Sequence, residues 1–403
     1  MNLHGINTDL KRTVTSLPQP AAAALAHSGR LVDRIHAEID SHGGKIGFDR
    51  YMELVLYEPG LGYYSAGARK FGHEGDFVTA PEISPLFAIC LARQCRQILA
   101  DQPDGSILEL GAGTGRMACD LLLELQRSDA LPANYFILET SADLKQRQQQ
   151  LLQVEIPDYF SNIIWLDHLP EQLFTGVVLA NEVMDALPVH RIVDRQGDLK
   201  ELQVCKNAGG FAWLEVPANP ELCRLAQKIR QQLHYPWPAV YTTEISMTLA
   251  PWITTLAGWL KQGVMLLIDY GYPRSEYYHP QRVDGTLLCH YRHRVHADPF
   301  LYPGLQDITA SVDFTAVAAA AVAAELSVSG FASQSYFLLG CGLDNILAGY
   351  SGREPKKFLE ITNQAKLLTL PGGMGERFKV IGLARGVDAG LMGFSLADQR
   401  RLL

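Results

Sequence analysis

No stretch of the 403-residue sequence is apolar enough to cross a membrane, which takes about 18 consecutive apolar residues. The nearest case, residues 316–324, is alanine-rich and is followed by Glu325. Residues 1–20 lack the apolar core of a secretory signal, although Lys11 and Arg12 are compatible with a weak transit peptide. We therefore expect no membrane insertion and a cytoplasmic protein, or one of the mitochondrial matrix if the source is eukaryotic.

Positive charge and closely spaced cysteines are also scarce. The chain has 35 Lys and Arg against 43 Asp and Glu, a net charge of −8. This balance argues against a broad phosphate-binding surface, so nucleic acid is not expected as a substrate, whereas a basic protein or peptide is compatible with it. The seven cysteines form no Cys-x-x-Cys pair, which predicts reduced, intracellular thiols.

The most informative segment is residues 107–116, with the sequence ILELGAGTGR. An apolar run is followed by glycines at 111, 113 and 115, and a helical pattern begins at once. Strand, glycine turn and helix in this order form the nucleotide-binding corner of a doubly wound α/β sheet. Glycine permits the tight turn and the approach of a ligand to the backbone, and the helix N-terminus offers free N–H groups.

The details of this motif favour S-adenosylmethionine over a dinucleotide. A dinucleotide fingerprint would place its third glycine at position 116, which is Arg116. Glu109 is unfavourable beside a pyrophosphate but suits the ammonium group of S-adenosylmethionine. Glu139 ends the next predicted strand, where an acid accepts hydrogen bonds from ribose hydroxyls. The motif therefore predicts a methyltransferase that binds this cofactor through Glu109, Gly111, Gly113, Gly115 and Glu139, with a NAD-dependent oxidoreductase as the alternative.

Polar residues also follow the third and fourth predicted strands. Asp167 could bind the adenine amine, and Asn181 is a further cofactor candidate at the same sheet edge. Glu182 and Asp185 are three residues apart, so on one helical turn both would face the same cleft. Paired carboxylates match a guanidinium, which makes these two acids the candidate catalytic residues for arginine methylation. The alternative is that Asp185 caps the next segment and Glu182 is a solvated surface acid.

Two other acids are weaker candidates for substrate binding. Asp269 ends a later apolar strand, and Glu244 precedes a predicted helix, whose dipole is the preferred explanation for it. The histidines at 290, 293 and 296 are interleaved with arginines at a spacing unlike that of zinc ligands, so no metal site is predicted.

Alternating strand and helix patterns predict an α/β fold with a mostly parallel, Rossmann-like sheet. Residues 1–30 are predicted to be loosely structured, and residues 31–104 to form a helical N-terminal region. The core domain then covers residues 105–403. Insertions are expected at about 189–245, as antiparallel hairpins, and at about 272–312, as a long segment rich in Tyr, His, Arg and Pro.

Several blocks of this sequence resemble the MidA family of class I methyltransferases. They are FDRYMEL at 48–54, YEPGLGYY at 57–64, GDFVTAPE at 75–82, the glycine motif at 109–115, ANEVMDALP at 180–188, IDYGY at 268–272, CHYRHR at 289–294 and DIT at 307–309.

This resemblance implies more than the motif alone predicts. It implies a sheet whose last strand is antiparallel, and an N-terminal region that caps the cofactor site, with Asp76 and Thr79 closing over the cofactor. The mitochondrial member of the family is an assembly factor of respiratory complex I that is similar to a protein arginine methyltransferase. The resemblance therefore implies an arginine-bearing protein substrate, with a respiratory-complex subunit as one candidate. A non-catalytic assembly factor that binds S-adenosylmethionine is the remaining alternative.

Overall fold

The computed structural model describes residues 17–65, 79–350, 352, 354–388 and 390–403. Contacts between residues divide the chain into two compact units, each made of three separate segments. Unit 1 comprises Met1–Phe77, Asp185–Leu249 and Tyr272–Asp313, and unit 2 comprises Val78–Met184, Ala250–Gly271 and Phe314–Leu403. The two predicted insertions therefore share a unit with the N-terminal segment, whereas the sequence suggested consecutive domains.

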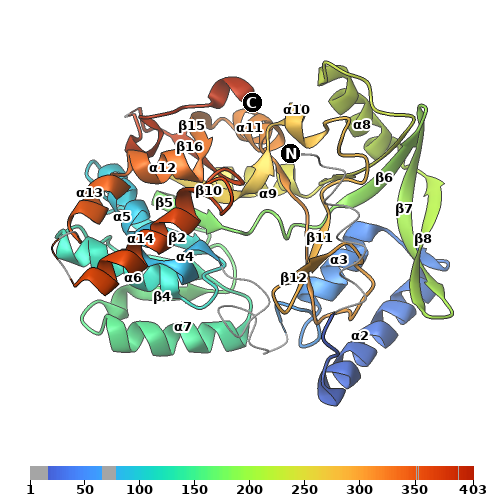
Figure 1. Cartoon of the computed structure of the whole chain (residues 1–403), viewed down its shortest axis with the longest axis horizontal. Helices are drawn as coiled ribbons and strands as arrows, with labels where there is room; N and C mark the ends of the chain where they lie inside the picture. The colour runs from blue at the N-terminus through green and yellow to red at the C-terminus, as the bar shows by residue number, and fades with distance from the viewer. Residues whose placement is uncertain (1–16, 66–78, 351, 353, 389) are drawn as a thin grey trace. The chain divides into compact units, whose positions relative to one another are not determined.

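Unit 2 is built on a mostly parallel sheet with the strand order β15-β16-β10-β5-β2-β3-β4 (Figure 1). Strands β10, β5, β2, β3 and β4 run parallel to their neighbours in this order, and β16 is antiparallel to both β10 and β15. The predicted class I methyltransferase sheet with an antiparallel last strand is thus confirmed. The strands are β2 (Ser106–Leu110), β3 (Tyr135–Leu138), β4 (Ile163–Leu166), β5 (Phe174–Asn181), β10 (Leu260–Tyr272), β15 (Ser327–Ser333) and β16 (Phe378–Arg385).

The central strands of this sheet are apolar on both faces because helices cover them, as is usual for parallel sheets. Every residue of β2 is buried, and Ile107 packs in one core with side chains of α5, α6 and α14. Local sequence fixes where the helices begin: Ser84 caps α5 by accepting a hydrogen bond from Leu86 N (3.3 Å). The helices are α4 (Ala80–Ile83), α5 (Pro85–Leu99), α6 (Arg116–Arg127), α7 (Ala142–Glu155), α9 (Leu249–Trp259), α11 (Phe314–Ala323), α12 (Gln334–Gly340), α13 (Leu343–Ala348) and α14 (Pro355–Thr369).

Unit 1 is antiparallel. Its larger sheet has the order β1-β7-β6-β9, with β8 paired to β7, and a smaller sheet has the order β12-β11-β13. The hairpins predicted for the first insertion are present, and the second insertion also contains short strands. The elements are α2 (Ala22–Ser41), β1 (Lys45–Ile46), α3 (Phe48–Tyr57), β6 (His190–Arg195), β7 (Asp198–Asn207), β8 (Gly210–Pro217), α8 (Pro220–Gln232), β9 (Val240–Ile245), α10 (Arg274–Tyr277), β11 (Leu288–Tyr291), β12 (Arg294–His296), β13 (Asp307–Thr309) and β14 (Val312–Asp313).

Helix α2 begins earlier than the sequence suggested. Residues 22–30, expected to be loose, are helical, because the alanine-rich start continues the pattern of Leu31, Ile35 and Ile39 on the buried face. Ser28 Oγ anchors this turn by donating to Pro303 O at 2.8 Å. None of the helices within the described ranges has the length and hydropathy of a membrane-spanning segment.

Candidate active site

The glycine motif forms the turn between β2 and α6 in unit 2. Gly111, Gly113 and Gly115 have φ values of +65°, +54° and +84°, a region that favours glycine over other residues. The turn is also crowded, since a Cβ at Gly115 would lie 3.3 Å from Gln148 Cγ. Helix α6 starts at Arg116, so the free N–H groups of its first turn follow the glycines directly.

Glu139 follows β3, next to this turn, and is 7% exposed. Its Oε1 accepts a hydrogen bond from Ser141 N (2.9 Å), and its Oε2 accepts one from Gln148 Nε2 (3.0 Å). These donors fix the orientation of the carboxylate. A carboxylate is the kind of acceptor that a pair of ribose hydroxyls needs.

Gln148 on α7 is a member of the site that the sequence analysis missed. It is fully buried, and its Nε2 also donates to Gly113 O at 2.9 Å. Its Oε1 accepts from Trp165 Nε1 at 3.0 Å. One side chain thus links the glycine turn, Glu139 and β4. Its signal in the sequence is a polar residue at the centre of the buried face formed by Leu144 and Leu152, where an apolar residue is expected.

The segment before α5 is linked to the glycine turn as well. Thr114 Oγ1 donates to a carboxylate oxygen of Glu82 in α4. Thr79 immediately precedes α4, and Glu82 N donates to its carbonyl oxygen at 3.0 Å. Thr79 therefore lies one short helix away from the turn, and its contact with the cofactor stays a prediction. Asp76 lies outside the described residues.

Glu109 lies inside β2, beneath the glycine turn, and is 1% exposed. Tyr135 Oη donates to its Oε2 at 2.6 Å. Burial raises the pKa of Glu109 to about 7; the hydrogen bond from Tyr135 opposes this shift and the charge of Glu139 adds to it. The carboxyl group is thus bound within the sheet, and its contact with an ammonium group stays a prediction.

We expect Glu109→Gln to stabilise the cofactor-free protein at pH 8 by about 3 kcal/mol and to have little effect near pH 4. The folded-state pKa of about 7 exceeds the ordinary value of 4.5, so the folded protein holds this proton more tightly than the unfolded chain. The resulting stability is complete below about pH 4.5 and is lost as the pH rises through 7. Glutamine is neutral throughout. Urea unfolding at both pH values measures the difference; equal stabilities of variant and wild type at pH 8 would contradict the expectation.

Glu182 directly follows β5, on the strand beside β2. Its φ is +54°, a strained conformation for a residue with a side chain, and such strain clusters at functional sites. Its N–H donates to Ile268 O (2.9 Å), and Asn181 Nδ2 donates to its Oε1 (3.1 Å). The side chain of Asn181 thus orients the carboxylate of Glu182. The contact predicted between Asn181 and the cofactor stays a prediction. The chain at 182–187 contains no helix, so the predicted helical turn that would join Glu182 to Asp185 is wrong.

Asp269, a predicted substrate residue, is fully buried near the end of β10. Its Oδ2 accepts from Met184 N (2.9 Å), and its Oδ1 accepts from Tyr270 N (2.8 Å). This carboxylate therefore fastens the loop that carries Glu182, which is a positioning role. Asp167, in contrast, is largely exposed and pairs with Lys145 Nζ at 3.3 Å, and its predicted contact with adenine is untested.

The other predicted substrate acids lie in unit 1. Asp185 is buried, and its backbone oxygen accepts from Ala310 N at 2.9 Å. Glu244 is fully buried within β9, five residues before α9 begins at Leu249. It is therefore not in the first turn of that helix, and the helix-dipole interpretation is wrong. Its Oε2 accepts from Thr286 N (2.7 Å), and its Oε1 lies 3.4 Å from Arg191 Nε. Glu244 therefore stabilises the loop around Thr286.

One group of side chains in the described part of unit 1 has a geometry compatible with a metal ion: Asp49, His190 and Glu201, whose ligand atoms lie within 4.8 Å of one another. His190 Nδ1 is 2.8 Å from Glu201 Oε1 and 3.5 Å from Asp49 Oδ1. Burial alone would lower the pKa of His190, but the hydrogen bond with Glu201 and the two negative charges outweigh it and raise the pKa. The hydrogen bond between His190 and Glu201 and the attraction of the nearby Asp49 carboxylate account for this cluster without a metal ion.

Comparison with known proteins identifies the family to which this chain belongs. Residues 86–332 match a family model described as "Putative S-adenosyl-L-methionine-dependent methyltransferase". A solved structure from Burkholderia thailandensis, bound to S-adenosylhomocysteine, superposes with a TM-score of 0.89 at 42% identity, over 96% of this chain and 100% of that chain. The chain belongs to this methyltransferase family.

Named relatives of the family are more distant. The Drosophila melanogaster protein named mitochondrial protein arginine methyltransferase NDUFAF7 homolog is 30% identical, over 92% of this chain and 89% of its own length. The Danio rerio protein named NDUFAF7 is 27% identical, over 83% and 82% of the two chains. The family uses S-adenosylmethionine, and the bare glycine turn and the oriented Glu139 carboxylate fit a ligand that carries a ribose.

We expect Glu139→Ala to weaken the binding of S-adenosylhomocysteine by roughly tenfold to a hundredfold, the value of a hydrogen bond to a charged acceptor. The loss follows because the carboxylate that would bind the ribose hydroxyls is removed. Isothermal titration calorimetry measures the affinity. Glu155→Ala, at the exposed end of the same α7 that carries Gln148, is the control and should bind like wild type; an unchanged affinity of Glu139→Ala would remove Glu139 from the cofactor site.

Proposed function

We propose that this methyltransferase transfers the methyl group to an arginine side chain of a protein substrate. The observation that carries the proposal is Glu182: an acid held in a strained conformation at the carboxyl end of β5, one strand from the glycine turn. The names of the relatives, protein arginine methyltransferases at 27–30% identity, support the same acceptor.

The position of Glu182 suits a guanidinium group. At this sheet edge Leu110 and Ala180 are paired across β2 and β5, so the residues that follow them, the glycine turn and the Glu182 loop, are neighbours. Val183 Cγ2 would lie 3.5 Å from a Cβ at Gly111. A carboxylate at this point can form charge-assisted hydrogen bonds with the planar donors of arginine.

S-adenosylmethionine supplies an electrophilic methyl group bonded to a sulfonium. In the proposed reaction a guanidinium nitrogen forms the new N–C bond while the C–S bond breaks and its electron pair remains on sulfur. Glu182 binds the guanidinium and aims the nitrogen, and its carboxylate accepts the proton that leaves that nitrogen. Such a reaction depends mainly on the positioning of the reacting groups. The hydrogen bond that Glu182 accepts from Asn181 and the one that its N–H donates to Ile268 O would position the Glu182 carboxylate.

The test is transfer of a labelled methyl group from S-adenosylmethionine to the proteins of a cell extract, followed by mass spectrometry of the labelled band. We expect methylarginine, and the peptide that contains it names the target. Label on another side chain would refute the arginine assignment. Binding of S-adenosylhomocysteine without any transfer would instead favour a non-catalytic assembly factor.

The cytoplasm remains the proposed compartment. The seven cysteines are free thiols, consistent with a reducing environment, and the solved relative from Burkholderia thailandensis comes from a bacterium. The named animal relatives are mitochondrial, so fractionation of the source cells, with an antibody against this protein, decides the compartment.

A further inference from the structure

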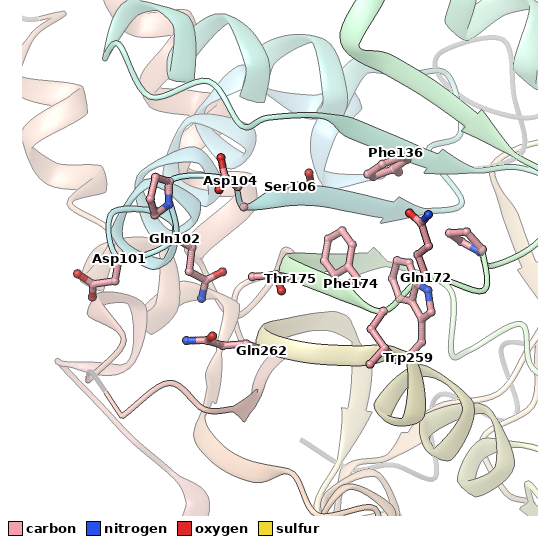
Figure 2. A pocket seen from close by; sticks show the side chains of 14 residues that line it. Asp101, Gln102, Asp104, Ser106, Phe136, Gln172, Phe174, Thr175, Trp259 and Gln262 are labelled. Carbon is pink, nitrogen blue, oxygen red and sulfur yellow. The ribbon is translucent and has the colours of Figure 1, made fainter.

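A cavity lies in unit 2, away from the glycine turn. It has a volume of about 500 Å³ and is formed at the amino ends of β2, β5 and β10, where Ser106, Phe174 and Gln262 line it (Figure 2). The glycine turn and Glu182 follow the carboxyl ends of β2 and β5. The cavity is therefore a different site from the candidate active site, at the opposite edge of the same sheet.

Aromatic side chains form one wall of this cavity. Phe174 and Trp259 stack with their ring centroids 4.5 Å apart and an interplanar angle of 16°, and Phe136 meets Phe174 edge-on at 6.3 Å. All three line the cavity. Phe174 and Trp259 are only 5% and 7% exposed, so the partly exposed Phe136 is the ring of this wall that can cover a flat or apolar group of a ligand.

A buried polar group faces the cavity from another side. Gln102 is 6% exposed, and its Oε1 accepts no hydrogen bond from the part of the chain that the structure describes. Figure 2 shows its side chain directed toward Gln262, and both residues line this cavity and a smaller adjoining one of about 110 Å³. A buried acceptor without a donor is unfavourable, so a ligand that donates a hydrogen bond here is favoured.

The charge of the cavity is negative. Asp101 and Asp104 line it at exposed positions, and neither is in an ion pair with a described residue. None of the 14 lining residues is Lys, Arg or His. Asp388 adds a third acid in the adjoining cavity. Anionic ligands such as phosphates are thus disfavoured, and a cation is favoured.

We propose that this cavity binds an arginine side chain of a partner protein. A guanidinium has a planar face that stacks on aromatic rings, a permanent positive charge and five N–H donors. The planar face matches the aromatic wall, the positive charge matches the two aspartates, and the N–H donors match Gln102 Oε1. The assignment concerns docking and does not depend on which atom is methylated at the active site.

The test is a calorimetric titration of the full-length protein with a short blocked peptide that alternates glycine and arginine. The titration is repeated in the Glu182→Gln background, which removes the proposed acceptor site and leaves the cavity intact. We expect saturable binding in both backgrounds. Gln102→Leu should weaken this binding by about tenfold. The double variant Asp101→Asn/Asp104→Asn should weaken it by about threefold to tenfold and make it less sensitive to salt. Glu360→Gln, an exposed acid on α14 outside the cavity, is the matched control and should bind like wild type.

The cavity variants and Glu360→Gln should bind S-adenosylhomocysteine with wild-type affinity, which confirms that they are folded and separates this proposal from the one on the active site. Absence of saturable binding up to about 1 mM peptide, a weak limit for a specific site, would overturn the proposal. Binding that is unaffected by both cavity variants would do the same. So would binding of the neutral, planar nucleoside adenosine in place of the arginine peptide.

Discussion

Replacement of Glu182 with glutamine should lower the rate of methyl transfer by about a hundredfold or more while the affinity for S-adenosylhomocysteine changes by less than about threefold. The variant loses the negative charge that would bind and aim the guanidinium, and two charge-assisted hydrogen bonds are each worth about 1.5–3 kcal/mol. Glutamine preserves the size of the side chain and can still accept from Asn181 Nδ2, so the loop should keep its conformation. Initial rates with labelled S-adenosylmethionine and the target peptide measure the effect.

A second substitution at the same position separates loss of function from loss of structure. Glycine adopts the φ of +54° without strain, so Glu182→Gly should be more stable than wild type by about 1 kcal/mol while it loses methyl transfer as Glu182→Gln does. Glu360→Gln serves as the control with wild-type rate. If Glu182→Gln retains most of the wild-type rate, Glu182 does not bind the acceptor.

Replacement of Asp269 with alanine should destabilise the protein by about 2–4 kcal/mol, because the buried N–H of Met184 and the half-buried N–H of Tyr270 lose their acceptor. Each orphaned donor costs about 1–3 kcal/mol. The same change releases the loop that carries Glu182, so methyl transfer at low temperature should fall as well. Urea unfolding at pH 7 measures the free energy of unfolding.

Two further variants serve as controls for the loss of stability in Asp269→Ala. Asp269→Asn keeps one side-chain oxygen as an acceptor and should lose roughly half as much stability as alanine. Asp158→Ala, an exposed acid between α7 and β4, should stay within about 0.5 kcal/mol of wild type. A loss of less than about 1 kcal/mol for Asp269→Ala would mean that this carboxylate does not hold the loop.

The sequence was sufficient to predict the glycine turn, the parallel strands around it and the acid after β3. These features are local: three glycines between an apolar strand and a helix allow few alternatives, and the polar residues that follow parallel strands gather at one sheet edge. The antiparallel strand β16 came from the family resemblance. Because the glycine motif is local, the cofactor could also be predicted before any distance was known.

Features that depend on long-range contacts could not be predicted. Gln148 reaches Gly113, 35 positions earlier in the chain, and only the fold brings them together. Glu244 and Asp269 are both acids near strand ends, which suggested substrate binding, yet both are buried and bind backbone N–H groups of distant loops. Burial of this kind depends on the assembly of separate segments into each unit, which no local pattern encodes.

Crystals of the protein grown with S-adenosylhomocysteine provide the most direct test of the cofactor site. We expect the methionine part to lie along the turn of Gly111, Gly113 and Gly115, with both ribose hydroxyls within hydrogen-bonding distance of Glu139. Ligand density at any other place in the chain, or a ribose bound by residues other than Glu139, would contradict the account.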